Sequence, residues 1–230
     1  MTAELVWAVV AAAGDGRRLG HERPKAFVKL GDRPLLAHAI ELLEGHPRVE
    51  RIVVVVPEGW EEPTALLADE LAAGKVAASV AGGPTRALSV AAGLGEVADA
   101  ATAVLVHDAA RPFASEALVD RVLSGLEWAD GAVPGIPVSD TVKRVRDGSV
   151  AETLQRSELR AVQTPQAFRA DALRRAYAGP PDDIADATDC AQLVERTGGR
   201  VVVVEGEATN VKITDADDLA RAEAAVQGAA

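Results

Sequence analysis

Residues 5–16 read LVWAVVAAAGDG, so a continuous apolar run leads directly into a glycine-rich turn. Residues 51–57, RIVVVVP, repeat the arrangement with an apolar run that stops at a proline. Apolar runs without polar alternation are typical of strands buried on both faces, and such strands occur mainly in parallel sheets. The two segments therefore predict parallel strands inside an α/β sheet.

Helical and extended patterns alternate along most of the remaining chain. Residues 34–43 carry apolar side chains at helical spacing behind Pro34, a residue that suits a helix start. Similar patterns predict further helices at 63–73, 86–94, 115–126 and 215–226, and strands at 77–80, 103–106, 132–138 and 201–204. No linker or repeat divides the chain, so we predict one Rossmann-like α/β domain over residues 1–230, with a mostly parallel sheet flanked by helices.

Residues 141–153, TVKRVRDGSVAET, interrupt this alternation. Polar and apolar residues alternate on both sides of Asp147-Gly148, which is a strong signal for a tight hairpin turn. The pattern predicts a two-stranded β-arm at about residues 139–160 that leaves the main sheet. Because an isolated hairpin is marginal in water, we expect the arm to pack against a second subunit.

The composition limits the classes of function. The formal net charge of −11 argues against binding of nucleic acids or anionic membranes, which requires an excess of Lys and Arg on one face. The longest apolar run, residues 5–13, is far below the roughly 18 residues of a membrane span, and Glu4 stands where a signal peptide has basic residues. The single cysteine, Cys190, excludes an internal disulfide and fits a reducing compartment. We therefore expect a cytoplasmic protein.

The glycine-rich turn is the first candidate site. Gly14 and Gly16 let backbone N–H groups approach an anion, and Arg18 adds a positive charge behind them. A second cation follows in residues 24–27, PKAF. The turn is not a Walker A motif, and its third glycine falls at position 20 rather than at the 19 of the dinucleotide fingerprint. For the glycines alone, a tight turn that binds nothing is an equal alternative; the added cations favour a triphosphate site.

Four further parts of the chain narrow the class. A strand followed by Gly-x-Gly-x-Arg and Pro-Lys resembles the opening of nucleotidyltransferases that activate sugar-like phosphates. The later segments are GGPTRALSV at 82–90, VHDAARPF at 106–113, TPQAF at 164–168 followed by DATD at 186–189, and NVKIT at 210–214. In this order, over about residues 5–222, they resemble the methylerythritol phosphate cytidylyltransferase family of nucleotidyltransferases. The resemblance implies that the segment at 82–90 reads the cytosine base.

The resemblance implies a nucleotidyltransferase fold, a role for each matched residue and a homodimer with shared active sites. It implies transfer of CMP from CTP to 2-C-methyl-D-erythritol 4-phosphate, with Mg²⁺ as cofactor. The implied catalytic residues are Arg18, Lys25, Arg156 and Lys212, and the implied CTP-binding residues are Ala12, Ala13, Gly14, Gly16, Gly82, Gly83, Ser89, Ala109 and Arg111. The implied substrate-binding residues are Asp108, Thr141, Arg156, Thr188 and Lys212. The resemblance also implies that Asp108 is a Mg²⁺ ligand; the alternative is that Asp108 pairs with Arg111 and binds no metal.

Other functions stay open on this evidence. A ribitol 5-phosphate cytidylyltransferase would share the CTP-facing residues, and a regulatory domain could bind CTP without turnover. An NAD-binding module needs an acid roughly 20 residues past the loop, and residues 34–39 offer none. Asp15, Pro84 and Thr209 depart from the family pattern. His107 is not expected to act as an acid or base, because neighbouring strand residues face opposite sides of the sheet.

Overall fold

The computed structural model describes residues 4–16 and 23–228. Its main sheet has the order β10-β7-β11-β6-β1-β4-β5, and β12 pairs with β7. The strands are β1 (Val6–Ala11), β4 (Val49–Val56), β5 (Val76–Ala81), β6 (Ala103–Asp108), β7 (Gly131–Pro137), β10 (Arg160–Val162), β11 (Gln166–Arg169) and β12 (Val201–Glu205). The helices are α1 (Leu35–Gly45), α2 (Glu61–Glu70), α3 (Arg86–Gly95), α4 (Glu116–Gly125), α5 (Ala170–Ala176), α6 (Pro181–Ala185), α7 (Cys190–Arg196) and α8 (Ala216–Gly228).

The apolar runs form the parallel centre of the sheet, as predicted. β1 pairs in parallel with β4 on one side and with β6 on the other, and β5 continues the parallel pairing beyond β4. Two short strands of the main sheet were not predicted: β11 runs antiparallel between β6 and β7, and β10 runs antiparallel to β7. The sheet is therefore mostly parallel, with an antiparallel insertion that brings residues 163–166 to the end of β6.

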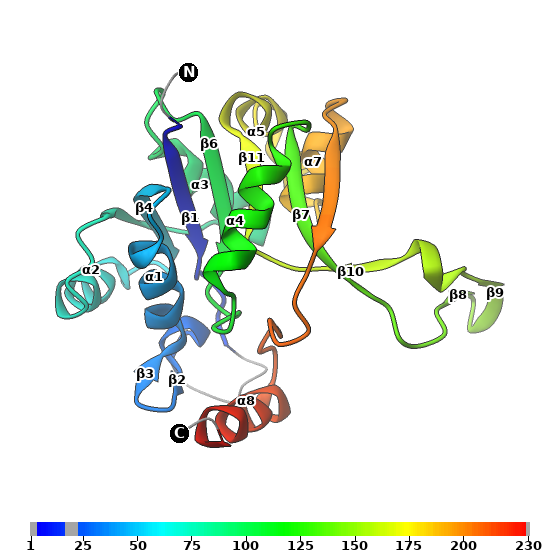
Figure 1. Cartoon of the computed structure of the whole chain (residues 1–230), viewed down its shortest axis with the longest axis horizontal. Helices are drawn as coiled ribbons and strands as arrows, with labels where there is room; N and C mark the ends of the chain where they lie inside the picture. Colours follow the sequence, from blue (N-terminus) through cyan, green and yellow to red (C-terminus); the bar gives the residue numbers. More distant parts are fainter. Residues whose placement is uncertain (1–3, 17–22, 229–230) are drawn as a thin grey trace.

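Helices cover both faces of the sheet, as Figure 1 shows. α1, α2 and α4 pack on one face through residues such as Leu36, Ala68 and Val119. α3, α5, α6 and α7 pack on the other, where Val90, Leu173 and other apolar residues meet the alternate side chains of β1, β4 and β6. Each central strand is thus buried on both sides, which explains why its sequence lacks polar alternation. None of the helices in the described ranges is long and apolar enough to cross a membrane.

The predicted hairpin is present as a separate two-stranded sheet of β8 (Lys143–Arg146) and β9 (Ser149–Thr153). Figure 1 shows it projecting sideways, away from the main sheet. Asp147 and Gly148 both have positive φ, 49° and 74°, as the tight hairpin turn requires. Val145 and Val150 are more than half exposed on this arm, so residues 4–16 and 23–228 leave these two side chains largely without apolar cover.

A third, smaller layer closes the end of the sheet below β1. The short helix η2 (Lys25–Phe27) leads into a two-stranded sheet of β2 (Lys29–Leu30) and β3 (Arg33–Pro34). α8 packs on this sheet through an apolar cluster that includes Leu30, Ile213 and Leu219. This contact fixes the C-terminal part of the chain next to the segment that carries Lys25.

Candidate active site

A pocket of about 450 Å³ lies at the carboxyl ends of β1 and β6. Ligands of open α/β sheets bind at this edge, outside the carboxyl ends of the strands. The pocket is lined by nine of the predicted site residues, namely Ala12, Ala13, Gly14, Gly16, Lys25, Ser89, Asp108, Ala109 and Lys212. Four segments that are far apart in the sequence therefore converge here. Arg18 lies outside the described residues.

The glycine-rich turn folds back onto the segment that carries Lys25. The backbone N–H of Lys25 donates to the carbonyl oxygen of Gly14 at 3.2 Å. Gly16 has φ +71°, and a Cβ there would lie 2.9 Å from the Lys25 backbone nitrogen. Only glycine fits this position without a shift of the backbone. The turn and Lys25 thus form one structural unit at the rim of the pocket.

The predicted base-reading segment is a close-packed turn that leads into α3. Thr85 caps the helix by accepting from the backbone N–H of Leu88. A Cβ on Gly82 would lie 2.4 Å from the Cβ of Ala13, so this glycine lets the segment pack directly on the glycine-rich turn. The buried Ser89 hydroxyl donates to the carbonyl oxygens of Thr85 and Gly83, at 2.9 and 3.2 Å. Its oxygen keeps lone pairs for a donor in the pocket.

Asp108 is the most strongly perturbed acid of the pocket. Its Oδ1 accepts from Arg86 Nε at 2.8 Å, and its Oδ2 accepts from Lys212 Nζ at 2.7 Å. Burial by itself raises the pKa of the Asp108 carboxyl, but the charges of Arg86 and Lys212 outweigh it and hold this pKa well below its usual value. Asp108 is therefore ionised at neutral pH.

Arg111 does not make the direct pair with Asp108 that the sequence offered as an alternative. Its guanidinium donates to the backbone carbonyl oxygens of Asn210, at 2.7 Å, and of Val162, at 3.4 Å. Arg86 takes the position at Asp108 instead. Arg86 belongs to the segment at 82–90, but no role was predicted for it from the sequence. The fold, and not a local sequence pattern, brings this arginine to the carboxylate that lies 22 residues later in the sequence.

Buried polar side chains behind the pocket connect β6 to the segment of Lys212, and these too were missed. The Asp108 backbone N–H donates to Thr164 Oγ1 at 3.0 Å, and this hydroxyl lies 3.2 Å from His107 Nδ1. Asn210 Nδ2 donates to the Thr164 carbonyl oxygen at 2.9 Å. His107 faces away from the Asp108 side chain as expected, and its burial lowers its pKa to about 4. It is a neutral structural residue, not an acid or base of the site.

The remaining predicted substrate residues do not line this pocket within one chain. Thr141 and Arg156 are exposed on the arm, where Arg156 Nη1 donates to the Ser139 carbonyl oxygen at 2.6 Å. Arg156 and Arg160 line a second, open pocket at the base of the arm. Thr188 is exposed at the start of α7 and bonds Gln192. The chain by itself therefore does not bring Arg156 to Asp108.

The described residues do not fit a magnesium ion held by protein ligands alone. They contain no group of three or more His, Cys, Asp or Glu side chains that could hold a metal. Both Asp108 oxygens already accept from cations, so a divalent ion would have to compete with Arg86 and Lys212. Asp108 as a metal ligand stays a prediction.

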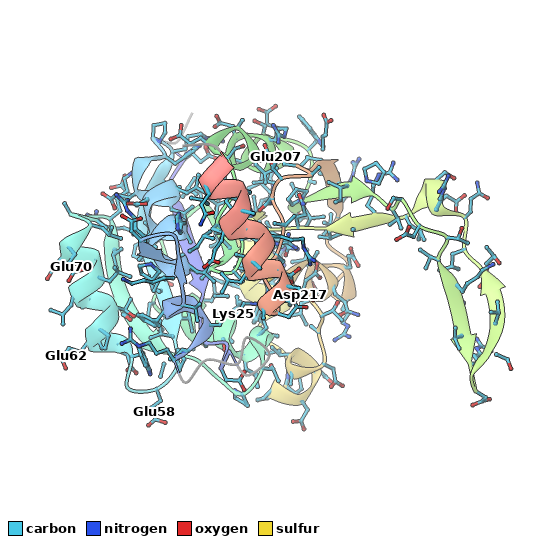
Figure 2. All side chains as sticks on the ribbon, turned by 90° about the horizontal axis from the view of Figure 1, so that it is seen from below. Lys25, Glu58, Glu62, Glu70, Glu207 and Asp217 are labelled. Carbon is cyan, nitrogen blue, oxygen red and sulfur yellow. The ribbon has the colours of Figure 1, made fainter. Side chains whose placement is uncertain are left out.

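Acidic residues elsewhere do not crowd the pocket. Figure 2 shows the side chains of Glu58, Glu62 and Glu70 pointing outward at the edge of the molecule near α2, whereas Lys25 lies in its central part. All three glutamates are exposed. The pocket itself is lined by three cations, Lys25, Arg86 and Lys212, and by two acids, Asp15 and Asp108, so the large negative net charge of the chain is compatible with a small positive charge in the pocket.

The fold and the pocket together define a nucleotidyltransferase, in which a glycine-rich turn after the first strand, a close-packed turn before α3 and two cations around Asp108 share one pocket. A model of the family described as 2-C-methyl-D-erythritol 4-phosphate cytidylyltransferase matches residues 6–228. The chain belongs to this family. Membership confirms the predicted family, the enzyme class and cytidylyl transfer as the function.

Individual relatives and solved structures agree over nearly the whole length. The chain is 51% identical over 224 residues to the 2-C-methyl-D-erythritol 4-phosphate cytidylyltransferase of Rhodococcus jostii, covering 96% of this chain and 95% of the relative. The crystal structure of the Thermus thermophilus protein of that name has a TM-score of 0.79 at 37% identity, covering 97% of this chain and 99% of that one. 4-Diphosphocytidyl-2C-methyl-D-erythritol synthase from Anaerococcus prevotii has a TM-score of 0.86 at 29% identity, covering 98% and 97%. These structures confirm the predicted fold.

Proposed function

We propose that the pocket binds CTP and 2-C-methyl-D-erythritol 4-phosphate and transfers CMP between them. The observation that carries this assignment is the convergence of the glycine-rich turn, the segment of Ser89 and the pair of Asp108 with Lys212 on one pocket. The products are 4-diphosphocytidyl-2-C-methyl-D-erythritol and pyrophosphate. The reaction supplies an intermediate of isoprenoid biosynthesis.

The triphosphate of CTP would lie on the backbone of Gly14 and Gly16, beside Lys25 and Arg18. Backbone N–H groups and fixed cations stabilise phosphate charge without reorganising during the reaction. Ala12 and Ala13 lead into this turn, and Ala109, which follows β6, lies beside them, with its backbone N–H donating to the Ala11 carbonyl oxygen at 3.1 Å. Arg111 would act through the Asn210 carbonyl oxygen to which it donates, by fixing the segment of Lys212.

The hydroxyl of Ser89 supports cytosine over uracil. While its single proton is donated to the carbonyl oxygen of Thr85 or Gly83, the Ser89 oxygen accepts from a ligand. Cytosine presents an amino donor at N4, whereas uracil, like thymine, presents a carbonyl acceptor at position 4. Gly82 and Gly83 would let the base approach the backbone next to this oxygen. The arrangement therefore favours CTP among the pyrimidine nucleotides.

The chemistry is an in-line displacement at the α-phosphorus of CTP. A phosphate oxygen of methylerythritol phosphate forms the new P–O bond, and the bond to the β-phosphate oxygen breaks, releasing pyrophosphate. Phosphate is already ionised at neutral pH, so the nucleophile needs no general base. The protein contributes positioning and charge stabilisation, for which Arg18, Lys25 and Lys212 are the candidates.

A magnesium requirement belongs to the proposal. Mg²⁺ usually keeps several waters and binds one or two carboxylates together with substrate phosphates. Since Asp108 is already paired with Arg86 and Lys212, we expect the ion to be held chiefly by the triphosphate. Such an ion would neutralise part of the phosphate charge. The cytoplasmic location also stays a prediction from the sequence.

The methylerythritol phosphate site would be completed by the arm of a second copy of the chain. Two observations support this: Val145 and Val150 of the arm are exposed, and within one chain Arg156 lines a different pocket from Asp108. A two-fold dimer repeats each contact, so two shared sites follow. Lys25, Thr188 and Lys212 would then come from one chain, with Thr141 and Arg156 from its partner.

Complementation tests the shared site. Lys25→Ala and Arg156→Ala are prepared as inactive proteins, unfolded together in equal amounts and refolded. Random pairing makes about half of the dimers mixed, and in each mixed dimer one site carries both defects and the other neither, so activity returns to about a quarter of wild type. If subunit exchange is confirmed by mass and the mixture stays inactive, Arg156 acts within its own chain.

The activity itself is tested by pyrophosphate release with CTP, UTP, ATP and GTP against a panel of polyol phosphates. We expect release with CTP and methylerythritol phosphate together, dependent on a divalent cation. Equal rates with UTP would overturn the base assignment. Faster turnover of ribitol 5-phosphate would favour the alternative substrate, and CTP binding without any release would favour a regulatory domain.

A further inference from the structure

The Asp108 carboxylate in the pocket is shared by two cations, Arg86 and Lys212. Arg86 is the first residue of α3, and its Nη2 lies 2.7 Å from Asp108 Oδ1, the oxygen to which its Nε also donates. Lys212 approaches Oδ2 from the segment between β12 and α8. The side chain of Asp108 is only 8% exposed, so its charge depends on these partners.

Arg86 is the fixed cation of the two. Its side chain is 25% exposed, and its Nη1 lies 3.8 Å from the buried sulfur of Cys190, which in turn lies 3.2 Å from the Tyr177 hydroxyl. A guanidinium is also rigid and planar. Lys212 is 39% exposed, at the end of a flexible four-carbon stem, and lines the pocket. Lys212 is therefore the cation that can turn toward a phosphate.

Arg86 and Lys212 have different roles in the charge balance around Asp108. With only Lys212 beside it, the buried Asp108 carboxylate would hold the ammonium group tightly and cancel its charge. With Arg86 on Oδ1, the carboxylate is already balanced, and Lys212 keeps a net positive charge in the pocket while Oδ2 still orients it. A buried carboxylate with one partner removed is costly, so the cluster functions as a set of three.

We propose that Arg86 is a positioning residue of cytidylyl transfer, which balances Asp108 so that Lys212 is oriented over the pocket with its charge available to a phosphate oxygen. This inference rests on the proposed role of Lys212. Arg86 itself does not touch the reacting atoms; it acts through Asp108 on Lys212.

The test is a double-mutant cycle in kcat, with Arg86→Met, Lys212→Ala and the double variant. Arg86→Met keeps an unbranched stem of similar length and removes the charge. We expect kcat to fall by about tenfold to a hundredfold in Arg86→Met while KM for CTP changes by less than about threefold, because the loss is confined to the transfer step. In the Lys212→Ala background the same change should cost less than about threefold, since the group through which Arg86 acts is gone.

Arg174→Met is the matched control. Arg174 is a half-buried arginine that donates only to backbone carbonyl oxygens, among them those of Val97 and Ala98, and it lies outside the pocket lining. It should lose stability without losing kcat. Arg86→Lys restores a charge without the rigid guanidinium, and we expect it to recover most of the lost kcat.

The outcomes separate this inference from the proposed function. If wild type releases no pyrophosphate from CTP, or if Lys212→Ala is fully active, the proposed function or the role of Lys212 fails. If both are sound but the Arg86 and Lys212 losses multiply, Arg86 acts independently of Lys212 and the inference is overturned. Should Arg86→Met not fold, the cycle is run with Arg86→Lys, whose smaller loss must likewise vanish in the Lys212→Ala background.

Discussion

Substitution of Gly82 by alanine tests how closely the base-reading segment packs on the glycine-rich turn. An added Cβ would lie 2.4 Å from the Cβ of Ala13 and 2.8 Å from Ser89 Oγ. Carbon atoms in contact are normally about 3.5–4.0 Å apart, so one of the two segments must move by about 1 Å. Because Ala13 is followed directly by Gly14, the movement is expected to reach the phosphate-binding backbone.

The expected losses follow from this overlap. Inserting a methyl group into a packed region costs about 1–3 kcal/mol, and for a domain of this size each kcal/mol lowers Tm by about 2–4 °C. A displaced turn also binds the triphosphate less well, and a loss of about 1.4 kcal/mol in binding raises KM for CTP about tenfold. Thermal unfolding and initial rates at varied CTP concentration measure the two effects separately.

Gly95→Ala is the matched control at the other end of the same helix. Gly95 is the last residue of α3, and a Cβ there would meet nothing within 4 Å. Alanine in place of glycine in a helix is neutral or stabilising by up to about 1 kcal/mol, so Tm should stay or rise and KM should not change. If Gly82→Ala behaves like Gly95→Ala in both assays, the close approach of the two segments is wrong.

Three further predictions concern single groups. Arg18→Ala and Lys25→Ala should each lower kcat by about 10²-fold or more, the scale of one preorganised charge contact, and a rise in KM for CTP at constant kcat would instead show uniform binding. Burial raises the pKa of the Cys190 thiol, so the native protein should resist Ellman's reagent until it is unfolded, and rapid labelling of the native protein would contradict the burial. Burial lowers the pKa of His107 from 6.5 to about 4. Between these pH values only the unfolded state binds the proton, so the free energy of unfolding falls on acidification, by up to about 3 kcal/mol. Denaturant unfolding of His107→Gln should show a correspondingly flatter pH dependence, and parallel curves for variant and wild type would refute this.

The sequence predicts the parallel half of the fold well because burial on both faces leaves a strong local signal. β1 is a continuous apolar run, and β4 and β6 contain such runs at residues 52–56 and 103–106. Ser115 caps α4 by accepting from the Leu118 backbone N–H. The segment of residues 154–196 gives no such signal. β11 is only four residues long and β10 is exposed, so neither carries enough periodicity to be recognised. Their pairing is decided by the tertiary fold.

Some residues of the pocket can likewise be predicted from the sequence, and others cannot. Glycines and cations that follow a strand can be found from the sequence, because the carboxyl end of a parallel strand is a known ligand position. The partners of Asp108 could not be found, since Arg111 is near in sequence but donates to backbone carbonyl oxygens, while Arg86 reaches Asp108 from another element. Which arginine pairs with Asp108 depends on where the helices pack, and no local sequence pattern encodes that.

Strand register explains why these separate segments meet at one level. β1 and β6 pair so that Ala11 lies opposite Asp108, and β11 pairs with β6 so that Gln166 lies opposite Val106. The first pairing sets Asp108 beside the start of the glycine-rich turn, and the second brings Thr164 to the Asp108 backbone N–H. A slip of one residue would turn the Asp108 side chain to the opposite face, away from Arg86. The apolar residues of β6 suit either face and do not select a register, so contacts at its polar end, among them the Thr164 hydroxyl at the Asp108 backbone N–H, select the register on which the charge cluster depends.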